Sequence, residues 1–278
     1  MPLPAAWNNL GTTLGELRRF DEALHALETA RDLHQQTDDT RGQATAWNTL
    51  GTVLKELRRF DEALHALETA RDLHQQTDDT RGQAITWDHL GTVLRELGRF
   101  DEALHAHETA RDLHQQTGDT NNQAGAWNNL GTVLKELRRF DEALHAHETA
   151  RDLHQQTGDT HGQAITWNNL GTVWRERQRH GDAVAAGRRA IAMLTEAEDW
   201  FRAGEAWGEL ASTHSAAGND AAQVRKSWAE SAAAYARAGA EDEAAASRAK
   251  VGDQNVTQEE TPAEAHSVSD GKVSAERG

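Results

Sequence analysis

Apolar and small residues recur along this chain at a fixed spacing. A tryptophan stands every 40 residues, at Trp7, Trp47, Trp87, Trp127, Trp167 and Trp207. A leucine-glycine pair keeps the same register, at Leu10-Gly11, Leu50-Gly51, Leu90-Gly91, Leu130-Gly131 and Leu170-Gly171. A fixed period of this length is typical of an array in which each unit is one small packing element. The pattern predicts five clear units and a sixth, diverged unit.

Each unit contains two helical patterns. Trp87, Leu90, Gly91 and Leu94 lie at i, i+3, i+4 and i+7, so they form one stripe of a helix that stops near Gly98. The start of this helix carries a capping-box pattern, which recurs as Thr40/Gln43, Thr80/Gln83, Thr120/Gln123 and Thr160/Gln163.

The second helix of the unit begins at Asp101-Glu102, because acidic residues suit a helix N-terminus. It ends before Gly118, which can adopt the left-handed conformation that closes a helix. Small residues such as Gly91 and Ala103 let the two helices approach closely. Two antiparallel helices therefore form one unit.

Position by position, the units resemble the tetratricopeptide repeat family. The family pattern Trp-x-x-Leu-Gly-x-x-[Tyr/Leu], then Ala-x-x-x-[Phe/Leu]-x-x-Ala, is met by Trp47, Leu50, Gly51, Leu54, Ala63, Leu67 and Ala70. The resemblance covers about residues 4–250 and implies an all-α, right-handed helical-repeat solenoid. The usual unit is about 34 residues long and has a proline after its second helix. Here the unit has 40 residues, and Gln75 stands in the place of that proline.

The longer unit is similar to the repeats of kinesin light chains and of Pins-type spindle-orientation adaptors. It is also similar to arrays attached to bacterial regulatory NTPases, which implies a possible place in a signalling protein. We expect units at about 4–43, 44–83, 84–123, 124–163, 164–203 and 204–243, with a short terminal helix to about residue 250. Residues 251–278 are expected to be a disordered acidic tail, because they are rich in Ser, Gly and charge.

Composition excludes several functions. The formal net charge of −16 argues against nucleic acid, whose phosphates require clustered Lys and Arg. The chain has no cysteine, and it has no long apolar run or signal peptide, so we expect a cytoplasmic protein that does not enter a membrane.

The resemblance places the first helices on the concave face of the solenoid, and with them a polar row directly after each tryptophan. This row consists of Asn8, Asn48, Asp88, Asn128 and Asn168. Asparagine donates and accepts hydrogen bonds, which suits the backbone of an extended peptide. A second polar row follows one turn later, at Thr12, Thr52, Thr92, Thr132 and Thr172. The alternative is that both rows are ordinary solvated positions copied by duplication.

Charged residues form two further rows on the same helices. The basic row is Lys55, Arg95, Lys135 and Arg175, and each member is followed by a glutamate. These residues can select a charged ligand. Equally, they can be surface ion pairs that contribute little.

Histidine is abundant, with 15 copies in the chain. His105 and His107 point to different faces of one helix, so they cannot hold one metal ion together. His25, His65, His105 and His145 are interpreted as a stripe on the outer helices. We predict no metal site and no cofactor.

No glycine-rich phosphate loop, nucleophile elbow or HExxH motif occurs, and we predict no enzymatic activity. The sequence therefore predicts a scaffold that binds a peptide segment of a partner protein. Self-assembly through the repeat ends is the first alternative, and a metal protein or enzyme is the remote one.

Overall fold

The computed structural model describes residues 3–259, and every regular element in this range is an α-helix. The helices are α1 (Pro4–Glu16), α2 (Phe20–Gln36), α3 (Thr40–Glu56), α4 (Phe60–Gln76), α5 (Thr80–Glu96), α6 (Phe100–Thr117), α7 (Thr120–Glu136), α8 (Phe140–Thr157), α9 (Thr160–Glu176), α10 (His180–Glu196), α11 (Trp200–Ala216), α12 (Ala221–Arg237) and α13 (Glu241–Glu259). Residues 1–2 and 260–278 lie outside the described residues.

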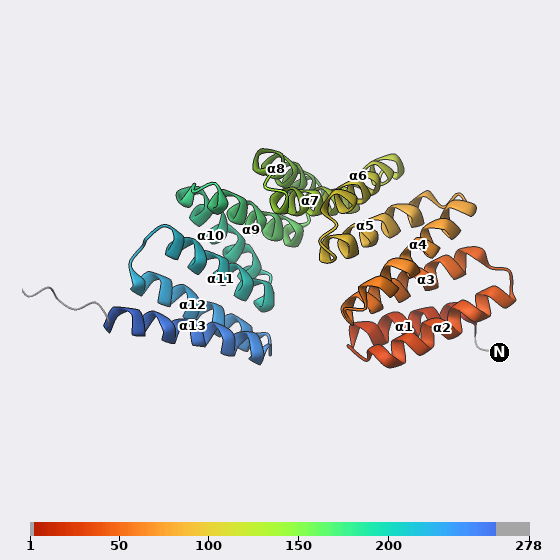
Figure 1. The fold of residues 1–278 in the computed structure, drawn as a ribbon, viewed down its shortest axis with the longest axis horizontal. Helices are drawn as coiled ribbons and strands as arrows, with labels where there is room; N and C mark the ends of the chain where they lie inside the picture. The colour runs from red at the N-terminus through yellow and green to blue at the C-terminus, as the bar shows by residue number, and fades with distance from the viewer. Residues whose placement is uncertain (1–2, 260–278) are drawn as a thin grey trace, which may run out of the picture.

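The helices stack as antiparallel pairs into an arc with α1 and α13 at its two ends (Figure 1). Each helix packs against the next along the chain, and consecutive odd-numbered helices from α1 to α11 also contact each other. Helices on the inside of a curve approach one another more closely than those outside, so the odd-numbered helices form the concave face. The predicted all-α solenoid is confirmed.

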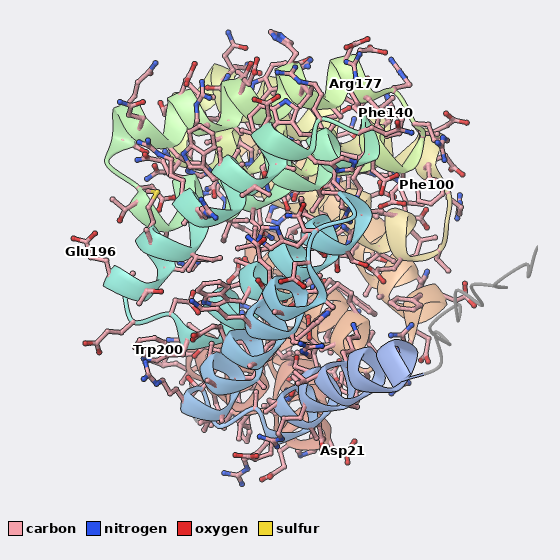
Figure 2. The ribbon with its side chains drawn as sticks, turned by 90° about the vertical axis from the view of Figure 1, so that its left-hand side faces the viewer. Asp21, Phe100, Phe140, Arg177, Glu196 and Trp200 are labelled. Carbon is pink, nitrogen blue, oxygen red and sulfur yellow. The ribbon has the colours of Figure 1, made fainter. Side chains whose placement is uncertain are left out.

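The turns lie along two edges of the array. Phe100, Phe140 and Arg177, which stand at turns within a pair, lie along one edge, whereas Glu196 and Trp200, at a turn between pairs, lie on the opposite edge (Figure 2). The two faces between these edges are therefore built from helix sides rather than from loops.

Close contact within a pair depends on the glycine of each leucine-glycine motif. A methyl group added at Gly51 would lie 2.5 Å from Leu67 Cγ, and one added at Gly131 would lie 2.6 Å from the ring of His147. Both distances are far below van der Waals contact, so only glycine lets Leu67 and His147 occupy these fully buried places.

Aspartate caps the first helix of each pair after the first. The Asp79 carboxylate accepts a hydrogen bond from the backbone N–H of Gly82 at 3.0 Å, and Thr80 is already helical. The same cap is formed by Asp39, Asp119, Asp159 and Asp199. The capping side chain must come from the non-helical residue before the first turn. The predicted threonine cap was therefore wrong, because the helices begin one residue earlier than the capping-box pattern indicates.

The repeated tryptophans lie at the seams between helix pairs. An arginine from the preceding outer helix lies over the rings of Trp47, Trp87, Trp127 and Trp167, with centroid distances of 5.0 Å for Arg31 on Trp47 and 4.8 Å for Arg111 on Trp127. His65 meets the edge of Trp47 at 6.2 Å. His25, His65, His105 and His145 are exposed on outer helices, as predicted. Contacts of this kind contribute roughly 0.5–1 kcal/mol each at exposed sites.

The final helix extends further than the sequence indicated. α13 continues to Glu259, whereas we expected the repeat domain to end at about residue 250. Gly252 weakens a helix by about 1 kcal/mol relative to alanine without ending it, and the next proline is Pro262. The structure thus differs from the tail prediction over residues 251–259, and the remainder of the predicted tail lies outside the described residues.

Candidate functional site

The row of residues after each tryptophan points into the gaps between helices. The Asn48 carboxamide oxygen lies 3.1 Å from both the Thr86 hydroxyl, which donates to it, and His89 Nδ1. The Asn128 oxygen lies 3.1 Å from His147 Nδ1 and accepts from the Asn169 amide at 3.0 Å. These oxygens are therefore already engaged within the protein.

Asn8 and Asp88 of this row make similar inward contacts. The Asn8 amide lies 3.3 Å from His34 Nε2, and the Asp88 carboxylate meets His107 at 3.2 Å and His114 at 3.0 Å. From the sequence we expected these side chains to face a bound peptide. For Asn8 and Asp88 the structure instead shows partners from the outer helix of their own pair.

Residues one position further along also line the concave face, together with members of the threonine row. Asn169, Thr172, Glu209 and Ser212 line one cavity on the inner helices. Thr12, Thr49 and Thr52 line another between α1 and α3. Successive residues on a helix point about 100° apart, so the positions directly after each tryptophan and the next positions along meet different neighbours.

The threonine row presents acceptors rather than donors. Each hydroxyl donates to a backbone carbonyl of its own helix, at 3.0 Å for Thr12, 2.7 Å for Thr52, 3.0 Å for Thr92, 3.1 Å for Thr132 and 2.8 Å for Thr172. Because the hydroxyl hydrogen is used internally, only lone pairs remain for a ligand.

The basic row is largely neutralised by its neighbours. Lys55 lies 2.9 Å from Glu56, Arg95 lies 2.6 Å from Glu96, and Lys135 lies 3.2 Å from Glu136. Arg175 pairs across to Glu209 of the next inner helix. Such partly exposed pairs contribute little to stability, but they hold the charges in place.

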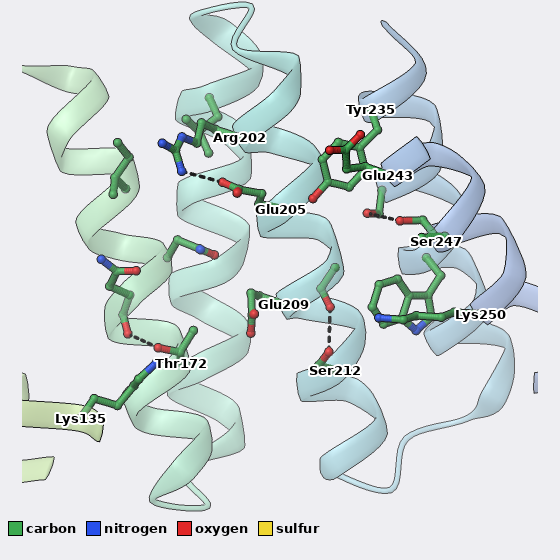
Figure 3. Close-up of a pocket in the computed structure, with 18 residues that line it drawn as sticks. Lys135, Thr172, Arg202, Glu205, Glu209, Ser212, Tyr235, Glu243, Ser247 and Lys250 are labelled. Atoms are coloured by element: carbon green, nitrogen blue, oxygen red, sulfur yellow. Dashed lines mark hydrogen bonds and ion pairs between the residues drawn. The ribbon is translucent and has the colours of Figure 1, made fainter. Parts of the chain in front are cut away.

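A cavity of about 510 Å³ opens near the C-terminal end of the concave face (Figure 3). Its walls come from the inner helices α9, α11 and α13 and from α12, with Lys135 of α7 at its margin. Asn168 also lines it, and its carboxamide oxygen is buried without a partner. A buried acceptor without a partner costs about 1–3 kcal/mol, so a bound donor would be favoured there.

Two aromatic side chains of α12 form the far wall because α11 carries glycine opposite them. A methyl group at Gly204 would lie 2.9 Å from the Tyr235 ring, and one at Gly208 would lie 3.2 Å from the Trp228 ring. Gly208 occupies the place that Asn168 holds one period earlier. In the diverged sixth unit, glycine therefore replaces the polar side chain, and an aromatic ring of α12 packs against it.

The electrostatics around Tyr235 are strongly acidic. Burial and the negative charges of Glu205, Glu243 and Glu209 together raise the pKa of Tyr235 to about 12, while Arg202 opposes them. At the other end of the wall, the Lys250 ammonium lies 4.0 Å from the centroid of the Trp228 ring. The cavity thus combines carboxylates, aromatic rings and a cation from its own chain.

The sequence predicted Lys135, Asn168 and Thr172, which line this cavity, but it did not predict the cavity itself or its aromatic wall. The predicted rows recur from unit to unit, whereas Trp228 and Tyr235 belong to the unit in which the pattern fails. The signal in the sequence was the loss of the repeated residue at Gly204 and Gly208, next to new aromatic residues on the following helix.

Within residues 3–259, no group of three or more His, Cys, Asp or Glu side chains is placed to hold a metal ion. In the same range, no helix is long and apolar enough to cross a bilayer.

One family model of the tetratricopeptide repeat matches residues 3–76, 42–116 and 122–196, and a second model of that repeat matches residues 89–150. The chain belongs to the tetratricopeptide repeat family. No curated protein matches it in sequence.

Solved tetratricopeptide-like structures are similar in fold. A Rap protein complexed with Competence and Sporulation Factor has a TM-score of 0.65 at 14% identity, over 91% of this chain and 75% of that one. A STAND ATPase with a tetratricopeptide repeat sensor from Pyrococcus horikoshii has a TM-score of 0.70 at 13% identity, over 92% of this chain and 43% of that one. A putative kinesin light chain with nearly identical repeats, from Podosopora anserina, has a TM-score of 0.60 at 13% identity, over 72% of this chain and 99% of that one. At these identities the likeness concerns the fold alone.

Proposed function

We propose that this tetratricopeptide repeat protein is a non-catalytic interaction module that binds a polypeptide segment of a partner protein on its concave face. The cavity between α9, α11, α12 and α13 is the observation that carries the proposal. It lies on the inner helices and joins polar groups to aromatic walls, the combination that orients and holds a ligand. The Rap protein, which shares the fold, was solved in complex with a factor, which supports a ligand on this kind of scaffold.

A polypeptide suits the groups that line this cavity. The unpartnered oxygen of Asn168 would accept from a backbone N–H, and the Asn169 side chain lies beside it on the same helix. An extended segment presents backbone N–H groups at regular intervals along the concave face. The threonine row Thr52, Thr92, Thr132 and Thr172, and the basic row Lys55, Arg95, Lys135 and Arg175, extend the proposed surface from the cavity toward α3.

A random peptide library tests this proposal even though the natural partner is unidentified. Peptides displayed on phage would be selected against the full chain, and the enriched peptides would be titrated by calorimetry. We expect Asn169→Ala to weaken binding by about 1–2 kcal/mol, roughly ten-fold, because a lost hydrogen bond in a shielded site has this value. The control is Glu148→Ala on the outer helix α8, which should leave the affinity unchanged. Failure to enrich any peptide, or equal effects of both variants, would contradict the proposal.

A second candidate is end-to-end assembly. Leu10 of α1 is 44% exposed and Leu17, directly after α1, is 62% exposed, whereas Leu50, the equivalent of Leu10, is 3% exposed. This apolar end could pack against another repeat array. Sedimentation velocity over a range of concentrations distinguishes this candidate, since an assembly that Leu10→Glu abolishes would support it, and a concentration-independent monomer would contradict it.

A further inference from the structure

We infer that the cavity takes a basic side chain, lysine or arginine, of the bound segment at its Tyr235 end. This inference rests on the proposed function and specifies the chemistry of the partner. Three features of the described residues support it: the converging carboxylates, the lone pairs that lining hydroxyls offer, and a cation already placed on the aromatic wall.

The carboxylates converge from two helices. Glu205 and Glu209 project from α11, and Glu243 projects from α13 toward the same opening (Figure 3). Arg202 lies 2.9 Å from Glu205, and Arg175 pairs with Glu209. Glu243 has no ion pair with any residue in the described part of the chain, so one carboxylate at the Tyr235 end is left for a cation from outside.

The hydroxyls of the lining add acceptors and remove donors. Ser212 donates to the Gly208 carbonyl at 3.0 Å, and Thr172 donates to the Asn169 carbonyl. Together with the unpartnered oxygen of Asn168, these groups offer lone pairs to a ligand. Ammonium and guanidinium groups carry donors and no acceptor, so they complement such a lining, whereas a carboxylate or phosphate does not.

The aromatic wall already binds a cation. Lys250 places its ammonium 4.0 Å from the Trp228 centroid, within the range of a cation–π contact. Tyr235 and Trp228 lie seven residues apart on α12, so they present their rings on the same side of that helix. A basic side chain at Tyr235 would therefore occupy a place beside the one that Lys250 fills.

The net charge of the chain also favours a basic ligand. The formal net charge is −16, and a surface of this sign draws a basic segment toward it over long distances. The acidic end of the cavity then disfavours acidic segments at short range, because an acidic residue there would be repelled by Glu243 and its neighbours.

The test is a double-mutant cycle on peptides enriched from the library. Each lysine of an enriched peptide is replaced by norleucine, and each arginine by citrulline, and the dissociation constants are measured for wild type and for Glu243→Gln. We expect one basic residue whose replacement weakens binding to the wild type about ten-fold, and has little effect on binding to Glu243→Gln, since a charge-assisted hydrogen bond has about this value.

The matched control is Glu241→Gln, which makes the same change of charge on the same helix. Glu241 is exposed, pairs with Arg248 at 3.4 Å and does not line the cavity, so its replacement should preserve the full ten-fold effect. Peptides that bind the concave face without a basic residue, or equal effects in Glu243→Gln and the wild type, would overturn this inference and leave the proposed function standing. The absence of any concave-face peptide would overturn both.

Discussion

Asp88 accepts hydrogen bonds from two fully buried histidines of the facing helix, His107 at 3.2 Å and His114 at 3.0 Å. Burial alone would raise the pKa of Asp88, but the hydrogen bonds from His107 and His114 outweigh it, and the net effect is a lowered pKa. Every other clear unit has asparagine at this position. A charged cluster therefore holds the third helix pair together, whereas the other clear pairs have a neutral asparagine at this position.

Replacement of Asp88 by asparagine should destabilise the protein at neutral pH. The folded pKa lies below the unfolded one, so ionised Asp88 stabilises the fold above its unfolded value near 3.8, and this contribution is lost as the pH falls through the folded value. We expect a loss of roughly 1–3 kcal/mol at pH 7 and a smaller difference near pH 3. Urea unfolding at both pH values measures this, with exposed Asp101→Asn as the control. Equal losses at the two pH values would contradict the assigned role.

His147 should contribute to acid sensitivity. Burial, and next the positive charge of Lys135, lower the pKa of His147 from 6.5 to about 3. Between these values the unfolded chain binds a proton that the folded chain excludes, so stability falls as the pH falls below about 6.5. The slope for one such group is at most about 1.4 kcal/mol per pH unit.

His147→Leu should reduce this pH dependence, because Leu67 fills the equivalent place in an earlier unit. The measurement compares unfolding midpoints at pH 7 and pH 5 for His147→Leu and for the exposed control His145→Leu. An identical pH dependence in His147→Leu and the wild type would show that His147 is not a source of the acid sensitivity.

Two glycines of α7 should respond oppositely to the same substitution. Gly131→Ala would place its methyl group 2.6 Å from the His147 ring, and the overpacking should cost about 1–3 kcal/mol. Gly125→Ala meets nothing within 4 Å, and it should stabilise the helix by about 0.5–1 kcal/mol. Thermal melts of the two variants test this prediction, and similar melting temperatures would disprove the packing role of Gly131.

The turn within the fifth pair should be improved by glycine. Gln178 adopts a φ of 59°, and the same turn position in the third pair is Gly98, with a φ of 72°. Left-handed backbone costs a non-glycine residue about 1 kcal/mol. Gln178→Gly should therefore raise the melting temperature and Gly98→Gln should lower it, and changes in the same direction for both variants would contradict this reasoning.

The repeat period predicted most of the fold, because each unit carries the same apolar stripe and the same close-packed glycine. It could not predict which polar residues face the groove. Asn128 and Asn129 are adjacent and identical in type, and their roles depend on a histidine 19 residues after Asn128, at His147. A buried polar network needs a partner across the helix pair, and hydrophobic periodicity carries no information about such partners.

The repeat period could not predict the cavity for a related reason. Its walls arise where the sixth unit departs from the others, at Gly204 and Gly208 on α11 and at Trp228 and Tyr235 on α12. A repeat pattern identifies what the units share, whereas a singular binding site is formed by residues that they do not share.

Photo-cross-linking would locate a bound peptide on the solenoid. Benzoylphenylalanine would be introduced at Ser212, which lines the cavity, or at Ala229, which is exposed on the outer helix α12. A library-selected peptide would then be irradiated with each protein, and the cross-linked residue identified by mass spectrometry. Binding on the concave face predicts a cross-link from position 212 and none from position 229. A cross-link from position 229 alone would move the binding site off the concave face and contradict the proposed function.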